Sequence, residues 1–398
     1  MSAKLSISTD FVSRASKQVH VLTLTPFYPR LENDANGCFI AEPLPSIEEL
    51  GVQQTVIAVQ PFYYRRAEPS HSSRPALWRY YFSFPGGVGL PSAGAFLFAK
   101  ILSEVRRLHA SNPVHVIHAH SALPCGHAAA LISRKLGIPF VVTVHGLDAY
   151  STNQVRGLAG QWCKHVSRMV YRSAHTVICI SEKVRDRVVE GVTEDVKATI
   201  VYNGVDTTRF SPATESSDSD VILSIGTLIP IKGHELLLRA FASICAAFPK
   251  LSCKIIGEGP ERQRLNQLVA ELNITDRVLF LKRQTRCQVA DAMRQCIVFA
   301  LPSHFEALGC VYLEAMATAK AVIACSGQGI GEVIRHGING FLVNPNDLEG
   351  LSNALLVLLR RAELRTAVGQ AAQRTILEGL TLKHQGAQLA RIYLGCAK

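Results

Sequence analysis

In the C-terminal third the chain reads Ser303-His304-Phe305-Glu306-Ala307-Leu308-Gly309-Cys310-Val311-Tyr312-Leu313-Glu314-Ala315-Met316-Ala317. The apolar run 297–301 before it predicts a buried parallel strand, and the helical spacing of small and apolar residues predicts a helix over 310–319. Glu306 then lies in the strand-to-helix loop, and Glu314 lies about one turn inside the helix. The N–H groups and partial positive charge of a helix N-terminus favour phosphate. A diphosphate bound there would have a carboxylate on each side. One carboxylate could accept hydrogen bonds from the ribose of a sugar nucleotide, and the other from its hexose. The alternative is a surface Glu pair beside a core helix.

Short β-branched strands alternate with longer helical patterns along the whole chain, which is typical of parallel sheets. We predict strands over 19–23, 54–59, 114–118, 140–144, 176–180 and 198–201 in the first half. In the second half we predict strands over 221–225, 252–256, 278–281, 297–301, 321–324 and 341–343. Two such series predict an α/β protein with two facing Rossmann-like domains. The turn signal Asn203-Gly204 and the polar run 214–220 predict the joint between them.

Composition limits the compartment and the partners. The 398 residues are 48% hydrophobic, enough for two ordinary cores. The first 17 residues are polar, so we expect no signal peptide, and no run approaches the roughly 18 apolar residues of a spanning helix. The 11 cysteines are odd in number and never spaced as Cys-x-x-Cys. We therefore expect reduced thiols in a cytoplasmic protein, without disulfides or zinc.

The net charge of +11 calls for an anionic partner. No helix-turn-helix, zinc-finger or RNP-type signature accompanies the charge, so nucleic acid is not expected. Within 65–107, seven basic residues alternate with seven aromatic ones: Arg65, Arg66, Arg74, Arg79, Lys100, Arg106 and Arg107 with Trp78, Tyr80, Tyr81, Phe82, Phe84, Phe96 and Phe98. This mixture suits an anionic membrane or a lipid-phosphate acceptor. The alternative is an ordinary solvated basic face.

The Glu pair resembles the Glu-x7-Glu motif of retaining GT-B glycosyltransferases, glycosyltransferase family 4, including teichuronic- and colanic-acid type polysaccharide transferases. The resemblance extends from about residue 19 to residue 394. It implies that Glu314 holds the nucleotide ribose, that Glu306 contacts the donor sugar, and that backbone amides of Leu308, Gly309 and Cys310 bind phosphate. It also implies an N-terminal acceptor-binding domain over 1–205, a nucleotide-sugar domain over 206–380, and a terminal helix over 381–398 that folds back on the first domain.

A second motif follows the strand 221–225. Gly226 ends that strand, and Lys232 lies at the start of the next helix, where its ammonium can reach diphosphate oxygens. The family has Gly-Arg-x-x-x-x-Lys-Gly here with both basic residues on the phosphates, whereas this chain has Thr227 in place of the arginine. Thr227 can donate one hydrogen bond but carries no charge.

The N-terminal half supplies further candidates at strand ends, where open α/β sheets bind ligands. The strand 140–144 ends in His145-Gly146-Leu147-Asp148, which matches the family's His-Gly-x-Asp, so the resemblance places His145 beside the donor sugar. Asp148 would position the acceptor or cap the next segment, and His120 would line the acceptor side. The loop 26–39 resembles the family's glycine-containing loop, so Gly37 is expected to meet the diphosphate through its backbone.

Two apparent metal sites are rejected. Asp218-Ser219-Asp220 matches an Asp-x-Asp pattern, but it lies in a serine-rich linker before a strand. His115, His118, His120 and His127 lack acidic or cysteine partners at metal spacing. We therefore expect no metal and no cofactor.

The interpretation is a retaining hexosyltransferase that uses a nucleotide diphosphate sugar, with UDP-sugar favoured and GDP-mannose as the other candidate. Its acceptor would be a glycan or lipid-linked glycan in bacterial envelope or capsule synthesis, at the inner face of the cell membrane. One alternative is a nucleotide-sugar 2-epimerase of the same fold. Another is a non-catalytic basic protein that binds membrane or polysaccharide. An NAD-dependent dehydrogenase is disfavoured because no Gly-x-Gly-x-x-Gly follows the first strand.

Overall fold

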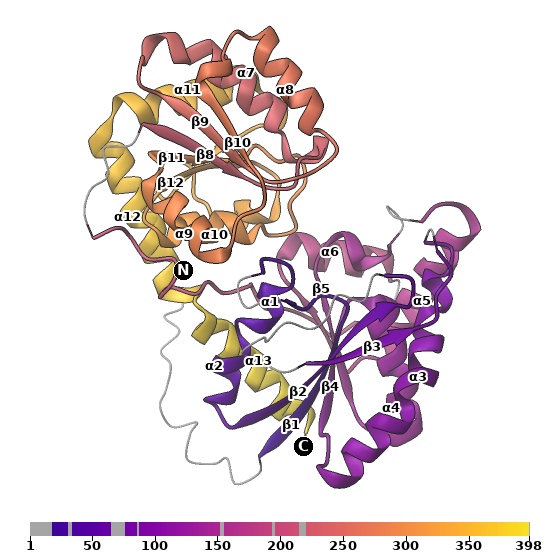
Figure 1. The fold of residues 1–398 in the computed structure, drawn as a ribbon. Coiled ribbons are helices and arrows are strands. Elements are labelled where there is room, and N and C mark those ends of the chain that lie inside the picture. The colour runs from indigo at the N-terminus through magenta and orange to yellow at the C-terminus, as the bar shows by residue number, and fades with distance from the viewer. Residues whose placement is uncertain are drawn as a thin grey trace.

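A computed structural model shows two α/β domains, each built on a parallel sheet (Figure 1). The structure describes residues 18–30, 34–64, 76–85, 87–151, 155–192, 196–214 and 220–397. In this part of the chain the N-terminal sheet has the order β3-β2-β1-β4-β5-β6-β7, and the C-terminal sheet has the order β10-β9-β8-β11-β12-β13. Every neighbouring pair of these strands is parallel. The prediction of two Rossmann-like domains is confirmed.

The strands of the first sheet are β1 (Val19–Thr25), β2 (Val52–Pro61), β3 (Leu77–Tyr81), β4 (Val116–His120), β5 (Phe140–Val144), β6 (Thr176–Cys179) and β7 (Ala198–Ile200). Those of the second sheet are β8 (Val221–Ile225), β9 (Ser252–Ile256), β10 (Val278–Leu281), β11 (Val298–Ala300), β12 (Ala321–Cys325) and β13 (Phe341–Val343). The sequence missed β3, because this edge strand is only half buried and its Trp, Arg and Tyr residues follow no clear alternation. The predicted strand 114–118 begins two residues before β4 and ends two residues before it, so His120 lies on the strand itself.

Helices cover both faces of each sheet. The N-terminal domain contains α1 (Cys38–Ala41), α2 (Leu44–Glu48), α3 (Leu90–Ser111), α4 (His127–Leu136), α5 (Gly157–Ser173) and α6 (Glu182–Gly191). The C-terminal half contains α7 (His234–Ile244), α8 (Arg262–Glu271), α9 (Arg286–Gln295), α10 (Cys310–Ala317), α11 (Leu348–Arg360), α12 (Ala362–Gly379) and α13 (Leu382–Cys396). None of the helices in the described part of the chain combines the length and apolar character needed to cross a membrane.

The alternation of side chains along β1 divides the N-terminal core into two layers. Leu22 and Leu24 pack with Leu97 of α3 on one face of the sheet. Val21 packs with Tyr393 of α13 on the other face. This is the period-two pattern of a strand that is buried on both sides. Helix α13 thus contributes to the core of the domain in which the chain begins.

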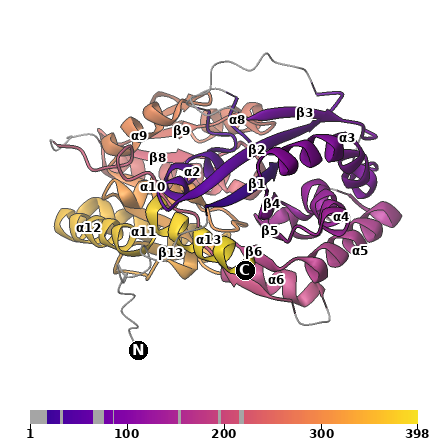
Figure 2. The same ribbon diagram turned by 90° about the horizontal axis from the view of Figure 1, so that it is seen from below.

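The chain crosses back to the N-terminal domain between α12 and α13, and α13 lies along that domain (Figures 1 and 2). Helix α13 starts after Thr381, whose hydroxyl accepts a hydrogen bond from the His384 N–H, and Thr381 also forms a β-bridge with Val205. Gly386 of this helix lies against Ser46 of α2, where a Cβ would come within 3.0 Å of the Ser46 side chain. The close approach fixes α13 beside β1 and α2.

The second sheet repeats the order of the first six strands of the first sheet, and in each the order reverses beside the first strand. The reversals lie between β1 and β4 and between β8 and β11. Ligands of open α/β sheets bind at the carboxyl ends of the strands at such a switch point. The loops after β1, β5, β8 and β11 are therefore the loops to search for a site.

Candidate active site

Glu306 lies in the loop after β11 and is only 8% exposed. Its Oε1 accepts a hydrogen bond from Lys232 Nζ at 2.6 Å and another from Ser303 Oγ at 3.0 Å. Its backbone N–H donates to Gln328 Oε1 at 3.2 Å. The predicted Glu-x7-Glu motif and the predicted Gly226–Lys232 motif thus meet in one charge-assisted pair.

Gly309 allows α10 to begin beside this pair. Its φ of 85° is left-handed, and a Cβ there would come within 2.5 Å of the Tyr312 ring. The Leu308 side chain is completely buried, so this residue can offer a ligand only its backbone. Cys310 opens the helix, and burial raises the pKa of its thiol to about 11, so the thiol stays neutral. The first N–H groups of α10 have no partner within the helix and can receive an anion.

The loop after β8 brings Lys232 to Glu306. Gly226 ends the strand, and Gly257 of the next loop packs so tightly on it that a Cβ would lie 1.9 Å from the Gly226 carbonyl oxygen. Gly233 has a φ of 70° and lies against the Pro302 carbonyl. These contacts lock the loops after β8, β9 and β11 together. Thr227 is exposed at the end of β8.

Glu314 is also paired with a base, and sequence reasoning missed that base. Arg286, the first residue of α9, donates from Nη1 to Glu314 Oε1 at 2.5 Å. Burial raises the pKa of Glu314, and Arg286 opposes that shift. Burial alone would lower the pKa of Arg286, but Glu314 and other negative groups around it raise it. No motif marks an arginine at a helix start, so nothing in the sequence pointed to Arg286.

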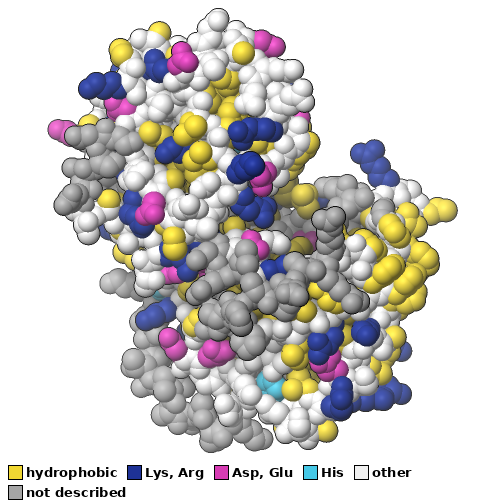
Figure 3. All heavy atoms as spheres, viewed as in Figure 1, with side chains coloured by type: hydrophobic (Ala, Val, Ile, Leu, Met, Phe, Trp, Pro, Cys, Tyr) yellow, Lys and Arg dark blue, Asp and Glu magenta, His cyan; other side chains and the backbone are white. Residues whose placement is uncertain are grey.

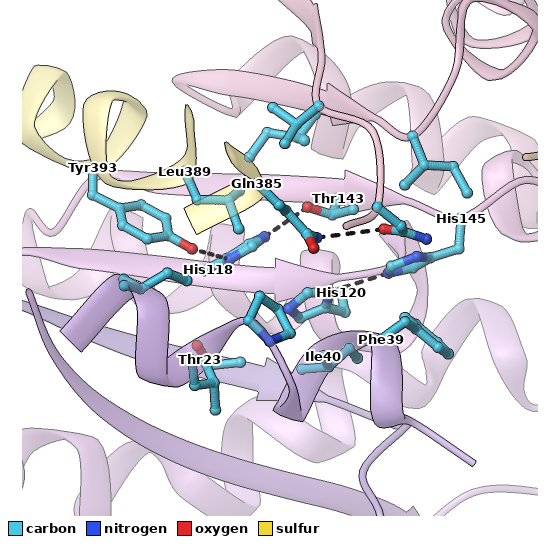
Figure 4. Close-up of a pocket in the computed structure, with 17 residues that line it drawn as sticks. Thr23, Phe39, Ile40, His118, His120, Thr143, His145, Gln385, Leu389 and Tyr393 are labelled. Atoms are coloured by element: carbon cyan, nitrogen blue, oxygen red, sulfur yellow. Dashed lines mark hydrogen bonds between the residues drawn. The ribbon is translucent and has the colours of Figure 1, made fainter. Parts of the chain in front are cut away.

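The wall of the N-terminal domain is a row of histidines (Figure 4). His120 Nδ1 lies 3.1 Å from His145 Nε2, and His118 lies between Tyr393 Oη and Thr143 Oγ1, at 2.7 Å from each. Burial lowers the pKa of His118 to about 3 and that of His145 to about 4, and it places the pKa of His120 well below its usual value. All three imidazoles are therefore neutral at physiological pH.

The histidine pocket is mostly filled by side chains. The space left inside is about 20 Å³, room for a single water-sized sphere. His120 is 7% exposed and lies behind His145, whose ring also packs on Phe39 at 4.9 Å. His145 is therefore the more accessible of the two, and His120, predicted to line the acceptor side, is instead buried against it.

Asp148 holds the loop that carries His145. Its Oδ1 accepts a hydrogen bond from the His145 N–H at 2.9 Å, while Oδ2 is buried without a partner among the described residues. Burial raises the pKa of Asp148 to about 6. Gly146 has a φ of 126°, and a Cβ there would come within 2.5 Å of the Ala307 Cβ. The His145 loop and the Glu306 loop thus touch across the two domains.

Gly37 lies in the loop after β1, at the switch point of the first sheet. Its φ is 79°, and a Cβ would lie 2.6 Å from the Tyr28 nitrogen, so only glycine fits. Asn36 beside it donates its N–H to Asp34 Oδ1 at 2.9 Å, and Asn33 falls outside the described residues. This loop leads directly into α1.

A second contact joins the domains at the N-terminus of α6. Ser181 Oγ donates to the Ala307 carbonyl at 2.5 Å. The Glu332 carboxylate accepts hydrogen bonds from the Glu182 and Lys183 N–H groups at 2.7 and 2.9 Å. Lys183 Nζ reaches Gln328 Oε1, which also accepts from the Glu306 amide. The glycine-rich segment 326–332 is thus part of an interdomain contact.

Most residues of the two rejected metal patterns lie in the described part of the chain. Within the described ranges, no group of three or more His, Cys, Asp and Glu side chains could hold a metal ion. Asp218 lies outside those ranges, and Asp220 directly precedes β8. His115 accepts a hydrogen bond from the His20 N–H at 3.0 Å, and His127 lies against Gly94, so neither joins the row of three.

Known proteins share this architecture. A family model described as Glycosyltransferase Family 4 matches residues 18–209, and one described as Glycosyl transferases group 1 matches residues 206–375. An uncharacterised glycosyltransferase of Methanocaldococcus jannaschii is 30% identical over 65% of this chain and 70% of its own length. The GDP-mannose-dependent alpha-(1-6)-phosphatidylinositol monomannoside mannosyltransferase of Mycolicibacterium smegmatis is 25% identical over 74% of this chain and 80% of its own.

Solved structures agree on the fold. The Anabaena protein HepE in complex with UDP superimposes with a TM-score of 0.74 at 20% identity, covering 95% of this chain and 100% of its own. With two family models that together span both domains, and with a relative at 30% identity over most of its length, the assignment does not depend on any single motif. The chain belongs to the GT-B glycosyltransferases of family 4.

Proposed function

We propose that this enzyme transfers a hexose from a nucleotide diphosphate sugar to a sugar hydroxyl and retains the anomeric configuration. The observation that carries the proposal is the pair of buried carboxylates, Glu306 and Glu314, on either side of the α10 N-terminus. UDP is the favoured nucleotide because the structurally similar HepE is a UDP complex. GDP-mannose is the other candidate, since a relative is named for it.

Charge stabilisation at the diphosphate would drive the reaction. As the bond between the anomeric carbon and the phosphate oxygen breaks, negative charge grows on the departing diphosphate. Lys232 and the free N–H groups of α10 are fixed there before the reaction starts, so they stabilise that charge without reorganising. Backbone N–H groups of the Gly37 loop would meet the diphosphate from the other domain. We propose that this set works without a metal ion or cofactor.

The proton balance follows from the groups beside the sugar. A new bond forms between the anomeric carbon and the acceptor oxygen on the face that the phosphate leaves. The acceptor proton passes to the departing phosphate oxygen. His145 is neutral, so it can hydrogen-bond a hexose hydroxyl but does not supply a proton at pH 7. Glu306 would accept a hydrogen bond from another hydroxyl of the hexose.

A product assay tests the proposal. Purified protein is screened by thermal shift against UDP, GDP and their sugars, because a bound ligand raises the melting temperature. The stabilising sugar nucleotide is then incubated with glycan acceptors, and the anomeric configuration of the product is read by NMR. An inverted product would contradict the retaining step. Epimerisation of the nucleotide sugar without an acceptor would favour the 2-epimerase instead. Absence of both binding and turnover would favour a non-catalytic binding protein.

We further propose a lipid-linked acceptor, reached by peripheral attachment to an anionic membrane on its cytoplasmic side. The support is an exposed apolar flank on the N-terminal domain, visible in Figure 3 where Figure 1 places β3, α3 and α5. Six aromatic residues there form ring contacts and are each 37–56% exposed: Phe62, Tyr63, Tyr64, Phe82, Phe84 and Phe96. The mannosyltransferase relative is also named for a lipid acceptor.

Helix α5 extends this flank, and sequence reasoning missed it. Leu158 is 84% exposed and Trp162 is 52% exposed, one turn apart on α5. The helix also carries Lys164, Arg168 and Arg172 and no acidic residue. Apolar and basic side chains on one helix suit an anionic bilayer surface. Of the arginines expected in this role, Arg79 is instead paired with Glu104, while Arg65, Arg66 and Arg74 fall outside the described residues.

Vesicle co-sedimentation tests the attachment. Binding to vesicles with anionic lipid should fall when salt is raised from 0.1 M to 1 M, because the Debye length falls from about 10 Å to about 3 Å. Trp162→Ala and Phe84→Ala should each weaken it. Leu279→Ala is the control, since Leu279 is 52% exposed on the other domain. Equal sedimentation of all variants at both salt concentrations would contradict the proposal.

A further inference from the structure

Arg286 joins the donor-site carboxylate to the opposite domain. Its Nη1 reaches Glu314 at 2.5 Å, and its Nε and Nη2 reach the two oxygens of Glu42 at 3.1 and 3.0 Å. Glu42 lies at the end of α1 in the N-terminal domain, whereas Arg286 and Glu314 belong to the C-terminal domain. Arg209 also donates to Glu42 Oε1 at 2.6 Å. Arg209, Glu42, Arg286 and Glu314 thus form a continuous row of paired charges between the two domains.

The surroundings hold Arg286 in one position. It is 6% exposed, and its guanidinium lies 4.7 Å from the centre of the Phe210 ring. A planar guanidinium can bind two carboxylates at once in a fixed fork, which a lysine ammonium cannot do. A buried cation that loses one of its anions is left poorly compensated. The position of Arg286 therefore depends on both Glu314 and Glu42.

The two carboxylates of this row of charges belong to different domains. Ile40 of α1 is buried in the N-terminal core with β1, so Glu42 moves with that domain. Glu314 is on α10 and moves with the donor domain. The contact of Arg286 with Glu42 thus exists only while the two domains approach each other. Arg286 engages only the Oε1 atom of Glu314, which leaves Oε2 to accept a hydrogen bond from a ribose hydroxyl.

We propose that Arg286 is a positioning residue that orients Glu314 for the nucleotide, and that Glu42 makes this orientation depend on domain closure. Nucleotide binding and closure then favour each other, because a coupling between two equilibria is reciprocal. The inference rests on the proposed function in one respect, that the ligand of Glu314 is a nucleoside diphosphate. It assigns a role in donor binding to Glu42, a residue of the opposite domain.

The test combines calorimetry with small-angle X-ray scattering. The affinity for UDP and GDP and the radius of gyration are measured for wild type, Glu42→Gln and Arg286→Lys. We expect Glu42→Gln to weaken binding of the nucleotide that binds wild type by about five-fold or more. It should also enlarge the radius of gyration of the ligand-free protein. Arg286→Lys keeps the charge but loses the fork, so it should behave like Glu42→Gln. The double variant should lose little more than either single one.

Glu49→Gln is the matched control, because it makes the same charge change at an exposed residue beside α2 in the same domain. Melting temperatures check that each variant is folded. Glu42 is partly exposed, so Glu42→Gln should disturb folding less than Arg286→Lys, which changes a buried residue. The inference is overturned if Glu42→Gln matches wild type and Glu49→Gln in both affinity and radius of gyration. If wild type binds neither nucleotide, the proposed function fails, while the scattering of the ligand-free variants still decides whether Glu42 holds the domains together.

Discussion

The two walls of the cleft differ in their chemistry. On the C-terminal wall every predicted carboxylate has a basic partner, Lys232 for Glu306 and Arg286 for Glu314. On the N-terminal wall the row of histidines is neutral, and His145 packs on aromatic rings. The charged wall suits the diphosphate, where negative charge grows as the bond breaks. The neutral wall suits sugar hydroxyl groups, which carry no charge.

The two carboxylates also differ from each other. Glu306 is connected to residues of its own domain through Lys232, Ser303 and Gln328. Glu314 is connected through Arg286 to Glu42 on the opposite domain. The first should therefore affect the chemistry at the sugar, and the second should affect how the nucleotide is held.

The largest expected effects separate these two carboxylates. Glu306→Gln should lower kcat about 100-fold, because a preorganised charged partner of the reacting sugar is lost. Glu314→Gln should weaken binding of the nucleoside diphosphate about ten-fold or more, since a hydrogen bond to a charged group contributes about 1.5–3 kcal/mol. Steady-state kinetics and calorimetric titration measure the two effects. If both variants lost the same affinity and the same kcat, the distinction between them would be wrong.

Lys232→Ala comes next and tests the charged wall directly. The substitution removes a charge-assisted contact with the diphosphate worth about 1.5–3 kcal/mol, which corresponds to about 10- to 100-fold in affinity. Calorimetric titration with the nucleoside diphosphate measures it. Lys250→Ala is the control, because Lys250 is exposed in the loop before β9. Unchanged affinity in Lys232→Ala would mean that this ammonium serves only Glu306.

Much of the fold could be predicted because strands buried on both faces have a strong sequence signal. β5, β8, β9, β10 and β13 have the predicted bounds. Where burial is one-sided or partial the signal fails, as at β3, whose residues are mostly half exposed. Local periodicity also cannot distinguish the last residues of a strand from the first residues of its loop, which explains the shift of β4.

The candidate site was predictable where its residues follow one another at a fixed spacing. Glu306 and Glu314 are eight positions apart, and Lys232 follows Gly226 in a short loop, so each pattern was visible. Arg286 and Glu42 are 244 positions apart and meet only because the two domains face each other. A single sequence carries no signal of such a pair. The same holds for His118 and Tyr393, which lie 275 positions apart.

The neutral wall should show itself in the pH dependence of stability. A histidine whose pKa falls from 6.5 when unfolded to about 3 or 4 when folded contributes stability above pH 6.5, and this is lost as the pH falls toward 4. At pH 5 each such histidine lowers the free energy of unfolding by up to about 2 kcal/mol, since one pKa unit equals about 1.4 kcal/mol. Asp148 opposes the trend. Burial raises its pKa from 3.8 to about 6, so the folded state binds this proton more tightly than the unfolded chain and gains stability as the pH falls.

We therefore expect wild type to lose stability between pH 7 and pH 5, and His120→Gln to lose less of it. Wild type should lose more because burial places the pKa of His120 well below its usual value, so the unfolded chain binds this proton before the folded protein does. Urea denaturation at pH 5, 6 and 7 measures both losses, with His165→Gln as the control at an exposed histidine. Equal losses in wild type and His120→Gln would mean that folding does not lower the pKa of His120.

The smallest expected effect is that of a chelator, and it tests whether the charged wall is sufficient. A diphosphate leaving group needs positive charge at the moment the bond breaks. Lys232 and the amides of α10 offer it without a metal, since the helix N-terminus acts as a fixed partial charge. Activity should therefore be unchanged in excess EDTA and unchanged when Mn²⁺ or Mg²⁺ is added. A complete loss that Mn²⁺ restores would mean that the enzyme needs a metal ion and that the Asp-x-Asp pattern at 218–220 was wrongly rejected. Asp218→Asn and Asp220→Asn would then abolish the metal requirement or the activity, whereas in a metal-independent enzyme both variants should match wild type.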